Sequence, residues 1–338
     1  MWTLALLWLA MTIGPVTPGA PNRQPQLASG YGVVAMTFAS GDSIYFAASH
    51  DDGMSFSAAV KVAEVKGLAV GRHRGPRVVI LKDAIVISAI AGDLISWRST
   101  NGGKTWHRAG TVNDVRGAAR EGLHAMAAGP SGELFAVWLD LRANGTKLYG
   151  ARSTDGGETW SPNVRIYSSP DGTICQCCDP SIAISGDATI TVMWRNLIAG
   201  ARDLYVASSH DGVHFDAARK LGEGTWKLDA CPMDGGGMVI YRGTIWSAWR
   251  RDRDVFIHRM GSAEERLGAG ADVAIAAGSK GIYVAWSQGP AIEIHVPGAA
   301  QPTRIAQEGA FVNLTPLADG SILAAWEQNG SIALQHVE

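Results

Sequence analysis

The sequence predicts an all-β fold, a β-propeller of six or seven four-stranded blades, with seven favoured. A short apolar strand that ends in an aromatic or apolar residue followed by polar residues recurs along the chain, with centres 37 to 56 residues apart. A unit of about four strands at this spacing is typical of a propeller blade. The seven centres are Phe38, Ile90, Trp138, Trp194, Trp249, Trp286 and Trp326.

The composition agrees with this architecture. The chain has 41 Gly and 12 Trp among 338 residues, and only 18% of its residues are charged. Such a composition suits short strands joined by tight turns, and no helical period is visible after the first 20 residues. The last repeat, from about Phe311 to Val337, shows three obvious strands. We therefore expect N-terminal residues near Gln24 to Ser29 to be able to complete a shared last blade.

An apolar run opens the chain and predicts a leader. Residues 2–13 are largely apolar, and a small-residue exit follows at residues 18–20. The run is too short to span a bilayer, so it predicts a signal peptide over residues 1–20, cleaved near Ala20. No Lys or Arg precedes the run, which leaves a retained anchor as the alternative. We expect a secreted or periplasmic protein with one propeller domain over residues 21–338 and no transmembrane segment in its mature chain.

The charge balance bears on the kind of partner. The formal net charge is −2, which gives no general attraction to nucleic acid or to a membrane surface. Of the 29 basic residues, 21 are Arg. Because the planar guanidinium matches carboxylate and phosphate geometry, this bias indicates an anionic ligand.

A second repeat has the form Ser-x-Asp-x-Gly-x-Thr-Trp and is predicted to lie between the third and fourth strands of a blade. Its Asp accepts main-chain hydrogen bonds, its Gly permits a positive φ, and its aromatic residue packs between sheets. We expect these Asp boxes to be structural, with no catalytic role. The copies are Ser153–Trp160, which is complete, Ser49–Phe56, Ser99–Trp106 with Asn101 at the Asp position, and Ser208–Phe215 with His210 there.

In these boxes and blade repeats the sequence resembles the sialidase (neuraminidase) superfamily, over most of the chain after residue 20. The resemblance implies six blades, arginines that bind a sugar carboxylate, a Tyr nucleophile assisted by Glu, and an Asp acid/base. Arg74-Gly75-Pro76 matches the Arg-x-Pro motif of the family. Two departures are that His73 stands where the family has an aromatic residue, and that no Tyr has a clear claim as nucleophile, Tyr241 being predicted on a turn away from the mouth.

Alternate connections of an antiparallel blade emerge on opposite faces of the disc. The loops between blades and those between second and third strands share one face, and 11 of the 21 Arg are predicted to fall there. The alternative is that these arginines form rim salt bridges with Asp140, Asp179, Asp203 and Asp254. The candidate substrate-binding residues are Arg74, Arg195, Arg250, Arg142 and Arg202. The candidate catalytic residues are Glu121, which would polarise a nucleophile, and Asp140 or Asp93 as the acid.

All four cysteines precede inner strands of two adjacent blades on the same predicted face. An even count in an exported protein normally indicates disulfides, here between the Cys175–Cys178 cluster and Cys231. The alternative is a soft-metal site, such as copper, formed by Cys175, Cys177, Cys178 and Cys231 with Met233 and His124, because thiolate and thioether ligands favour Cu(I). A reactive thiol is the third option.

Three functional hypotheses follow. The first is a secreted sialidase-like protein that acts on or recognises an acidic glycan or another carboxylate-bearing ligand, with exo-α-sialidase-type glycoside hydrolysis as its enzymatic form. The second is a non-catalytic copper-binding propeller that uses Cys, Met and His ligands. The third is a glycan- or protein-binding scaffold, since a fold alone does not define a function.

Overall fold

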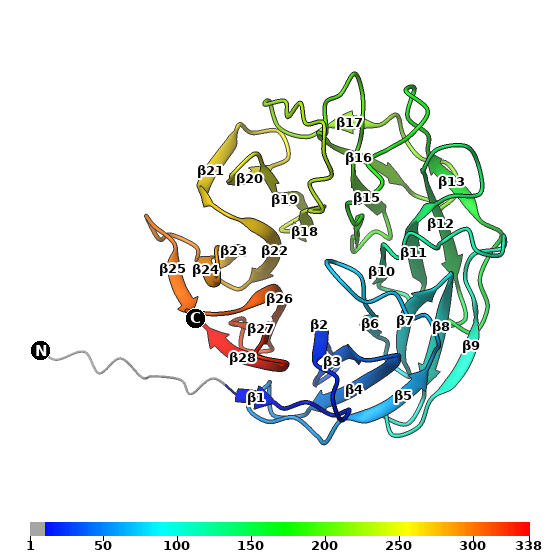
Figure 1. Cartoon of the computed structure of the whole chain (residues 1–338), viewed down its shortest axis with the longest axis vertical. Helices are drawn as coiled ribbons and strands as arrows, with labels where there is room; N and C mark the ends of the chain where they lie inside the picture. The colour runs from blue at the N-terminus through cyan, green and yellow to red at the C-terminus, as the bar shows by residue number, and fades with distance from the viewer. Residues whose placement is uncertain (1–10) are drawn as a thin grey trace, which may run out of the picture.

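The computed structural model describes residues 11–338 and forms a ring of seven four-stranded antiparallel sheets around an axis (Figure 1). The count of seven confirms the favoured prediction. The first strands of neighbouring blades contact one another around the ring, so they surround the axis. The part of the chain that the structure describes holds no helix long and apolar enough to span a membrane.

Each of the first six blades uses four consecutive strands, running outward from the axis. The first three are β2 (Asn22–Gly30), β3 (Val33–Ser40), β4 (Ser43–Ser49) and β5 (Val60–Glu64); β6 (Arg77–Ile80), β7 (Ile85–Ala91), β8 (Asp93–Ser99) and β9 (His107–Thr111); and β10 (His124–Ala128), β11 (Leu134–Asp140), β12 (Lys147–Ser153) and β13 (Val164–Tyr167). The next three are β14 (Ser181–Ile184), β15 (Ile190–Arg195), β16 (Leu204–Ser209) and β17 (Arg219–Lys220); β18 (Gly237–Tyr241), β19 (Thr244–Arg251), β20 (Asp254–Arg259) and β21 (Glu264–Ala269); and β22 (Ala271–Gly278), β23 (Gly281–Gln288), β24 (Ala291–His295) and β25 (Thr303–Ala306).

The seventh blade joins the two ends of the described chain. It contains β26 (Ala310–Pro316), β27 (Ile322–Gln328) and β28 (Ser331–Val337), and β1 (Met11–Ile13) is its outer strand. The register pairs Met11 with Leu334 and Ile13 with Ile332. The expectation that residues near Gln24 to Ser29 complete this blade was wrong. These residues lie in β2, where Gln26 to Ser29 pair with β3 and Leu27 packs in the core, so they form the inner strand of the first blade.

The predicted leader overlaps this closing strand. Residues 1–10 lie outside the described residues, and residues 11–13 form β1. Cleavage near Ala20 therefore stays a prediction, and it would leave β28 as the outer strand of the seventh blade.

The aromatic repeat forms the core between blades. Trp138, Trp194, Trp286 and Trp326 are each at most 1% exposed and lie on the second strands of their blades. A second strand is covered by neighbours within its sheet and by the adjacent blades on both faces, so its residues are apolar on both sides. For example, Trp138 of the third blade packs in one cluster with Val86 and Leu94 of the second. The aromatic residues that recur in the sequence are thus the residues that pack between neighbouring blades.

The Asp boxes join third to fourth strands, as predicted, and so lie on the face opposite the loops between blades. In the complete box, Ser153 Oγ donates to Asp155 Oδ1 at 2.8 Å, and Thr159 N donates to the same oxygen at 3.0 Å. Gly157 N donates to Ser153 Oγ at 2.8 Å. These bonds close the turn within itself, which confirms the structural interpretation.

The frame predicted for the fourth box was wrong by one residue. Ser209 Oγ, rather than that of Ser208, donates to Asp211 Oδ1 at 3.0 Å, and Gly212 N donates to Ser209 Oγ at 2.9 Å. The Gly lies three residues after the Ser here and four residues after it in the complete box. The turn is one residue shorter, so Asp211, not His210, occupies the Asp position.

The box glycines offer a test of how the blades pack. Gly102 and Gly103 are adjacent in the second box, with φ of +72° and +84°. A Cβ on Gly103 would collide with the Phe46 ring of the preceding blade, whereas a Cβ on Gly102 would meet nothing within 4 Å. We expect Gly102→Ala to lower the free energy of unfolding by about 1–2 kcal/mol through backbone strain. Gly103→Ala should cost a further ~1–3 kcal/mol through overpacking. Urea denaturation measures both, and equal losses would contradict the packing argument.

Candidate functional site at the axial mouth

The chain adopts an unusual backbone conformation where it enters several inner strands. Five non-glycine residues at these starts have φ between +54° and +57°. Side chains other than Gly rarely adopt this region, and such residues cluster at functional sites. They belong to blades one, two, five, six and seven and are Gln24, His73, Met233, Asp272 and Phe311. Unfavourable backbone conformations are thus concentrated at the mouth of the axis.

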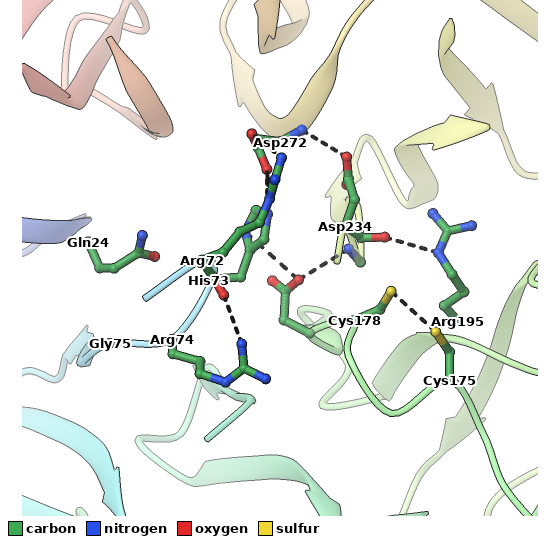
Figure 2. Close-up of polar contacts among 12 residues, drawn as sticks. Gln24, Arg72, His73, Arg74, Gly75, Cys175, Cys178, Arg195, Asp234 and Asp272 are labelled. Carbon is green, nitrogen blue, oxygen red and sulfur yellow. Dashed lines mark hydrogen bonds and ion pairs between the residues drawn. The ribbon is translucent and has the colours of Figure 1, made fainter. Parts of the chain in front are cut away.

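An ion-pair network spans this mouth (Figure 2). His73 Nε2 donates to Asp272 Oδ1 at 2.9 Å. Arg72 holds the same carboxylate with two hydrogen bonds, from Nε to Oδ1 at 3.0 Å and from a terminal nitrogen to Oδ2 at 2.9 Å. On the other side of the imidazole, Nδ1 lies 3.9 Å from Asp179 Oδ1. One imidazole therefore lies between two carboxylates from different blades.

A second aspartate, Asp234, holds the main chain at Asp272. Asp234 is fully buried, and its Oδ2 accepts a hydrogen bond from Asp272 N at 2.8 Å. Its main-chain oxygen accepts one from Arg195 Nε at 3.0 Å. Within residues 11–338, Asp234 Oδ1 has no hydrogen-bond partner. Asp234 therefore connects the axial network to the neighbouring Arg195 (Figure 2).

The charges of the network determine the protonation state of His73. Burial would lower the pKa of this imidazole, but the carboxylates of Asp179, Asp272 and Asp234 raise it to about 9. Burial likewise acts to raise the pKa of Asp272, but His73 and Arg72 outweigh it and lower that pKa. At neutral pH the mouth therefore contains an imidazolium between carboxylates.

The network borders a cavity on the axis. Its volume is about 200 Å³, and the inner strands of all seven blades contribute to its wall. Ligand pockets are commonly roughly 300–1,000 Å³, so this cavity suits one small polar unit rather than a long oligomer. The charged lining residues are His73, Arg77, Asp179 and Asp272.

The structure brings Arg74 and Glu121 together, from adjacent blade starts. Arg74 donates to Glu121 Oε1 at 3.0 Å and, from Nε, to the main-chain oxygen of Glu121 at 2.8 Å. The Arg74 side chain is 22% exposed. Both predicted residues lie beside the mouth, paired with each other.

Arg195 and Arg250 are placed differently. Arg195 is 1% exposed, and its guanidinium donates to the main-chain oxygens of Asp234, Arg202 and Arg250. Arg250 Nε donates to the oxygen of Asp252 at 2.6 Å, and the guanidinium carbon lies 5.4 Å from the Trp226 ring centroid. In this structure, Arg195 supports the chain around it.

Arg142 and Asp140 form a paired unit. Two guanidinium nitrogens of Arg142 contact Asp140 at 2.9 Å, and Trp138 Nε1 donates to the same carboxylate at 2.8 Å. Asp140 is fully buried. This arrangement matches the salt-bridge alternative for these two residues, and Asp140 does not line the axial cavity.

Two further residues discussed in the sequence analysis, Asp93 and Tyr241, do not line the axial cavity. Asp93 accepts a hydrogen bond from Asn113 Nδ2 at 2.7 Å. Tyr241 ends β18, at the hairpin opposite the mouth, and its hydroxyl donates to the Ser279 oxygen at 3.3 Å. The prediction that Tyr241 points away from the mouth is confirmed.

The cysteines form a compact sulfur cluster at the start of the fourth blade. Cys175 Sγ lies 3.4 Å from Cys178 Sγ and 3.8 Å from Cys177 Sγ, and all three residues are buried. Met233 packs against them from the fifth blade, and Cys231 is exposed. All four cysteines are free thiols in the structure. Hydrogen bonds from the other two thiols lower the pKa of Cys175.

Of two other predicted site residues, Arg202 contacts this cluster and His124 does not. A terminal nitrogen of Arg202 donates to Cys175 Sγ at 3.2 Å, so this arginine contacts sulfur. His124 is not among the clustered residues. Its Nε2 lies 2.9 Å from Ser88 Oγ, and burial and Arg77 lower its pKa.

Sequence reasoning did not identify Asp234 and Asp272 as site residues. Each is a single Asp near the start of an inner strand, and neither belongs to a motif. Asp234 is followed by Gly235 and Gly236, which permit close backbone approach, and that is the one local signal available. The partners of these residues come from distant parts of the chain.

Comparison with known proteins supports the fold. The BNR/Asp-box repeat model matches residues 97–108 and 151–162. No curated protein matches the chain. A polysaccharide lyase of family PL25, an ulvan lyase, is similar in structure with a TM-score of 0.60 and 10% identity, over 97% of this chain and 96% of the lyase.

Two glycosidase structures are also similar. The GH93 α-L-arabinofuranosidase of Fusarium graminearum, in complex with arabinobiose, has a TM-score of 0.56 and 14% identity, over 97% of each chain. The leech intramolecular trans-sialidase has a TM-score of 0.50 and 13% identity, over 97% of this chain and 69% of the enzyme. At these identities the likeness establishes a shared propeller fold.

The pKa of His73 predicts a pH-dependent stability. A folded-state pKa of about 9, above the ordinary value of 6.5, means that the imidazolium stabilises the fold fully below pH 6.5. This contribution is lost as pH rises through 9, and the difference of about 2.5 pH units limits it to about 3 kcal/mol. We expect the free energy of unfolding to fall over this range and His73→Gln to flatten the fall. Urea denaturation at several pH values tests this, and an unchanged slope in the variant would contradict it.

Proposed function

We propose that this protein recognises an acidic glycan at its axial mouth and acts on it as a glycoside hydrolase of the exo-α-sialidase type. The observation that carries the proposal is a cationic segment at the edge of the axial cavity. Arg72, His73 and Arg74 are consecutive, and the side chains of Arg72 and Arg74 are 36% and 22% exposed. The proposal includes export of the protein, on the strength of the leader predicted over residues 1–20.

The segment retains donors for a ligand. Two nitrogens of Arg72 bind Asp272, and its Nη1 has no partner within the described chain. Arg74 binds Glu121 through Nε and one terminal nitrogen, and its other terminal nitrogen makes a 3.4 Å bond to the Arg72 oxygen. A sugar carboxylate that approached from the mouth would meet the outer edges of both guanidinium groups, which bind carboxylates through paired N–H groups.

Asp179 is the carboxylate best placed for proton transfer in this proposal. It lines the cavity, and its Oδ1 accepts a hydrogen bond from Gly235 N at 3.2 Å. Its Oδ2 makes no hydrogen bond within the described chain. Asp140, by contrast, is fully buried and bound by Arg142. Asp272 supplies a second carboxylate at the same cavity, and glycoside hydrolases other than the sialidases with a Tyr nucleophile generally use two.

The structural neighbours support this proposal through their own activities. They are a lyase bound to a sulfated uronate-rhamnose unit, an arabinofuranosidase and a trans-sialidase. Each of these propellers acts on a glycan. The same architecture therefore serves several glycan chemistries, which leaves the sugar to be found by experiment.

Binding tests the first half of the proposal. Isothermal titration of sialyllactose and of uronate oligosaccharides into the protein should give saturable binding. We expect Arg74→Met to weaken it about 10- to 100-fold, because a charge-assisted hydrogen bond contributes about 1.5–3 kcal/mol. The control is Arg108→Met, at an exposed position in β9 far from the mouth. Absence of binding across the panel would exclude an acidic glycan ligand.

Turnover tests the second half. On any glycoside that the protein cleaves, Asp179→Asn should reduce kcat about 100-fold or more, since general acid–base catalysis contributes about 10²- to 10⁴-fold. The affinity should change little, because the amide retains the size of the carboxylate. Asp229→Asn, at an exposed position on the same face, is the matched control. Binding without turnover in the unmodified protein would instead establish the scaffold function.

A further inference from the structure

The sulfur cluster at the start of the fourth blade has a composition distinct from the axial cavity beside it. The loop that leads into β14 places three thiols in four residues, Cys175, Cys177 and Cys178, and all three are at most 8% exposed. Figure 2 shows Cys175 and Cys178 pointing toward each other beside Arg195. A loop segment that buries three thiols in contact is not required by propeller geometry, because the other blades begin without one.

The spacing of the sulfurs fits a single metal ion. Thiolates that bind one ion at about 2.3 Å lie about 4 Å from one another. Here the Sγ of Cys175 is 3.4 Å from that of Cys178 and 3.8 Å from that of Cys177, and all three sulfurs lie within 4.8 Å of one another. The separations are too long for disulfide bonds, which are about 2.05 Å.

The neighbouring blade contributes more sulfur. Met233 packs against the three buried cysteines, and Cys231, two residues earlier, is close enough to Cys177 to interact with its thiol. The cluster contains neither an imidazole nor a carboxylate among the residues that could share an ion. Thiolate and thioether ligands select soft ions, Cu(I) among them, and a thioether is not among the usual ligands of zinc.

The surroundings also balance charge. Three thiolates around a monovalent ion would carry a net charge of −2. A terminal nitrogen of Arg202 already donates to Cys175 Sγ at 3.2 Å, and the positive charge of Arg195 also acts on Cys175. Two guanidinium groups thus offset the charge of the complex, which lowers the cost of burying it.

From these observations we propose that Cys175, Cys177 and Cys178 bind one monovalent copper ion, with Cys231 and Met233 of the next blade covering it. Each thiol that ligates the ion releases its proton to solvent, and the copper stays Cu(I) throughout. His124 has no part in this site, because its ring bonds to Ser88 away from the sulfurs. The site goes beyond the proposed glycan function and does not depend on it.

Anaerobic titration of the reduced full-length protein with Cu(I) tests this site, with bicinchoninate as the competing ligand. We expect one copper per chain, a sulfur-to-copper charge-transfer band in the ultraviolet, and only sulfur in the first coordination shell of copper by X-ray absorption. Cys177→Ser should weaken binding at least tenfold. Arg202→Gln, which removes the contact to Cys175, should weaken it about 10- to 100-fold, as outer-shell partners of metal ligands do.

Two variants keep the test decisive if a buried substitution impairs folding. Cys231→Ser changes an exposed residue, so it should fold normally and still lose affinity. Met54→Leu, at an exposed position in an Asp box on the opposite face, should bind copper like the unmodified protein. Circular dichroism confirms the fold of each variant.

Three outcomes would overturn the proposal. Absence of Cu(I) binding by the fully reduced protein would show that the cluster is not a copper site. Preference for one Zn²⁺ over Cu(I) in direct competition would assign the site to zinc. Alkylation and mass measurement of freshly exported protein that found two disulfides in place of four thiols would establish structural bridges. None of these results bears on glycan binding, which is measured separately.

Discussion

The ion pair between blade two and blade six is the interaction around which the mouth is organised. Arg72 and His73 begin one blade, Asp272 begins the other, and 199 residues separate His73 from Asp272. These blades are not neighbours in the ring, so the pair crosses the axis. Both His73 and Asp272 have φ of +57°, and the surrounding charges keep the imidazole protonated. The network therefore fixes the shape of the cavity and its electrostatics together.

The ring itself follows from a simpler constraint that the sequence reveals directly. A four-stranded sheet with apolar residues on both faces of its second strand must be covered on both sides. The buried Trp residues at positions 138, 194, 286 and 326 are such second-strand residues, and their repeat in the sequence indicates the ring. The Asp boxes are equally local, because each closes its own hairpin. Local patterns therefore sufficed for the blade count and the box positions. They failed at Ser209, where a turn shortened by one residue moved the frame.

The site was less predictable because its residues meet only through the ring. Strand direction alone predicted a face rich in Arg, Cys and His, and on that face the structure pairs Arg74 with Glu121 and clusters Cys175, Cys177 and Cys178. The hydrogen-bond partner of each side chain could not be inferred from the sequence. Arg195 looks like a ligand-binding residue in sequence, but main-chain oxygens take its donors. Asp272 has no motif, and its partners Arg72 and His73 are about 200 residues away.

Asp234 connects the two halves of the mouth. Its side chain accepts a hydrogen bond from Asp272 N on the ionic side, and its main-chain oxygen accepts one from Arg195 on the sulfur side. Asp179 joins the halves a second time, because it directly follows Cys178 and lies near His73. The loop that positions the sulfurs thus also positions a carboxylate of the cavity. Because Cys178 and Asp179 are adjacent in the chain, the shape of the axial cavity and that of the sulfur cluster both depend on this one loop.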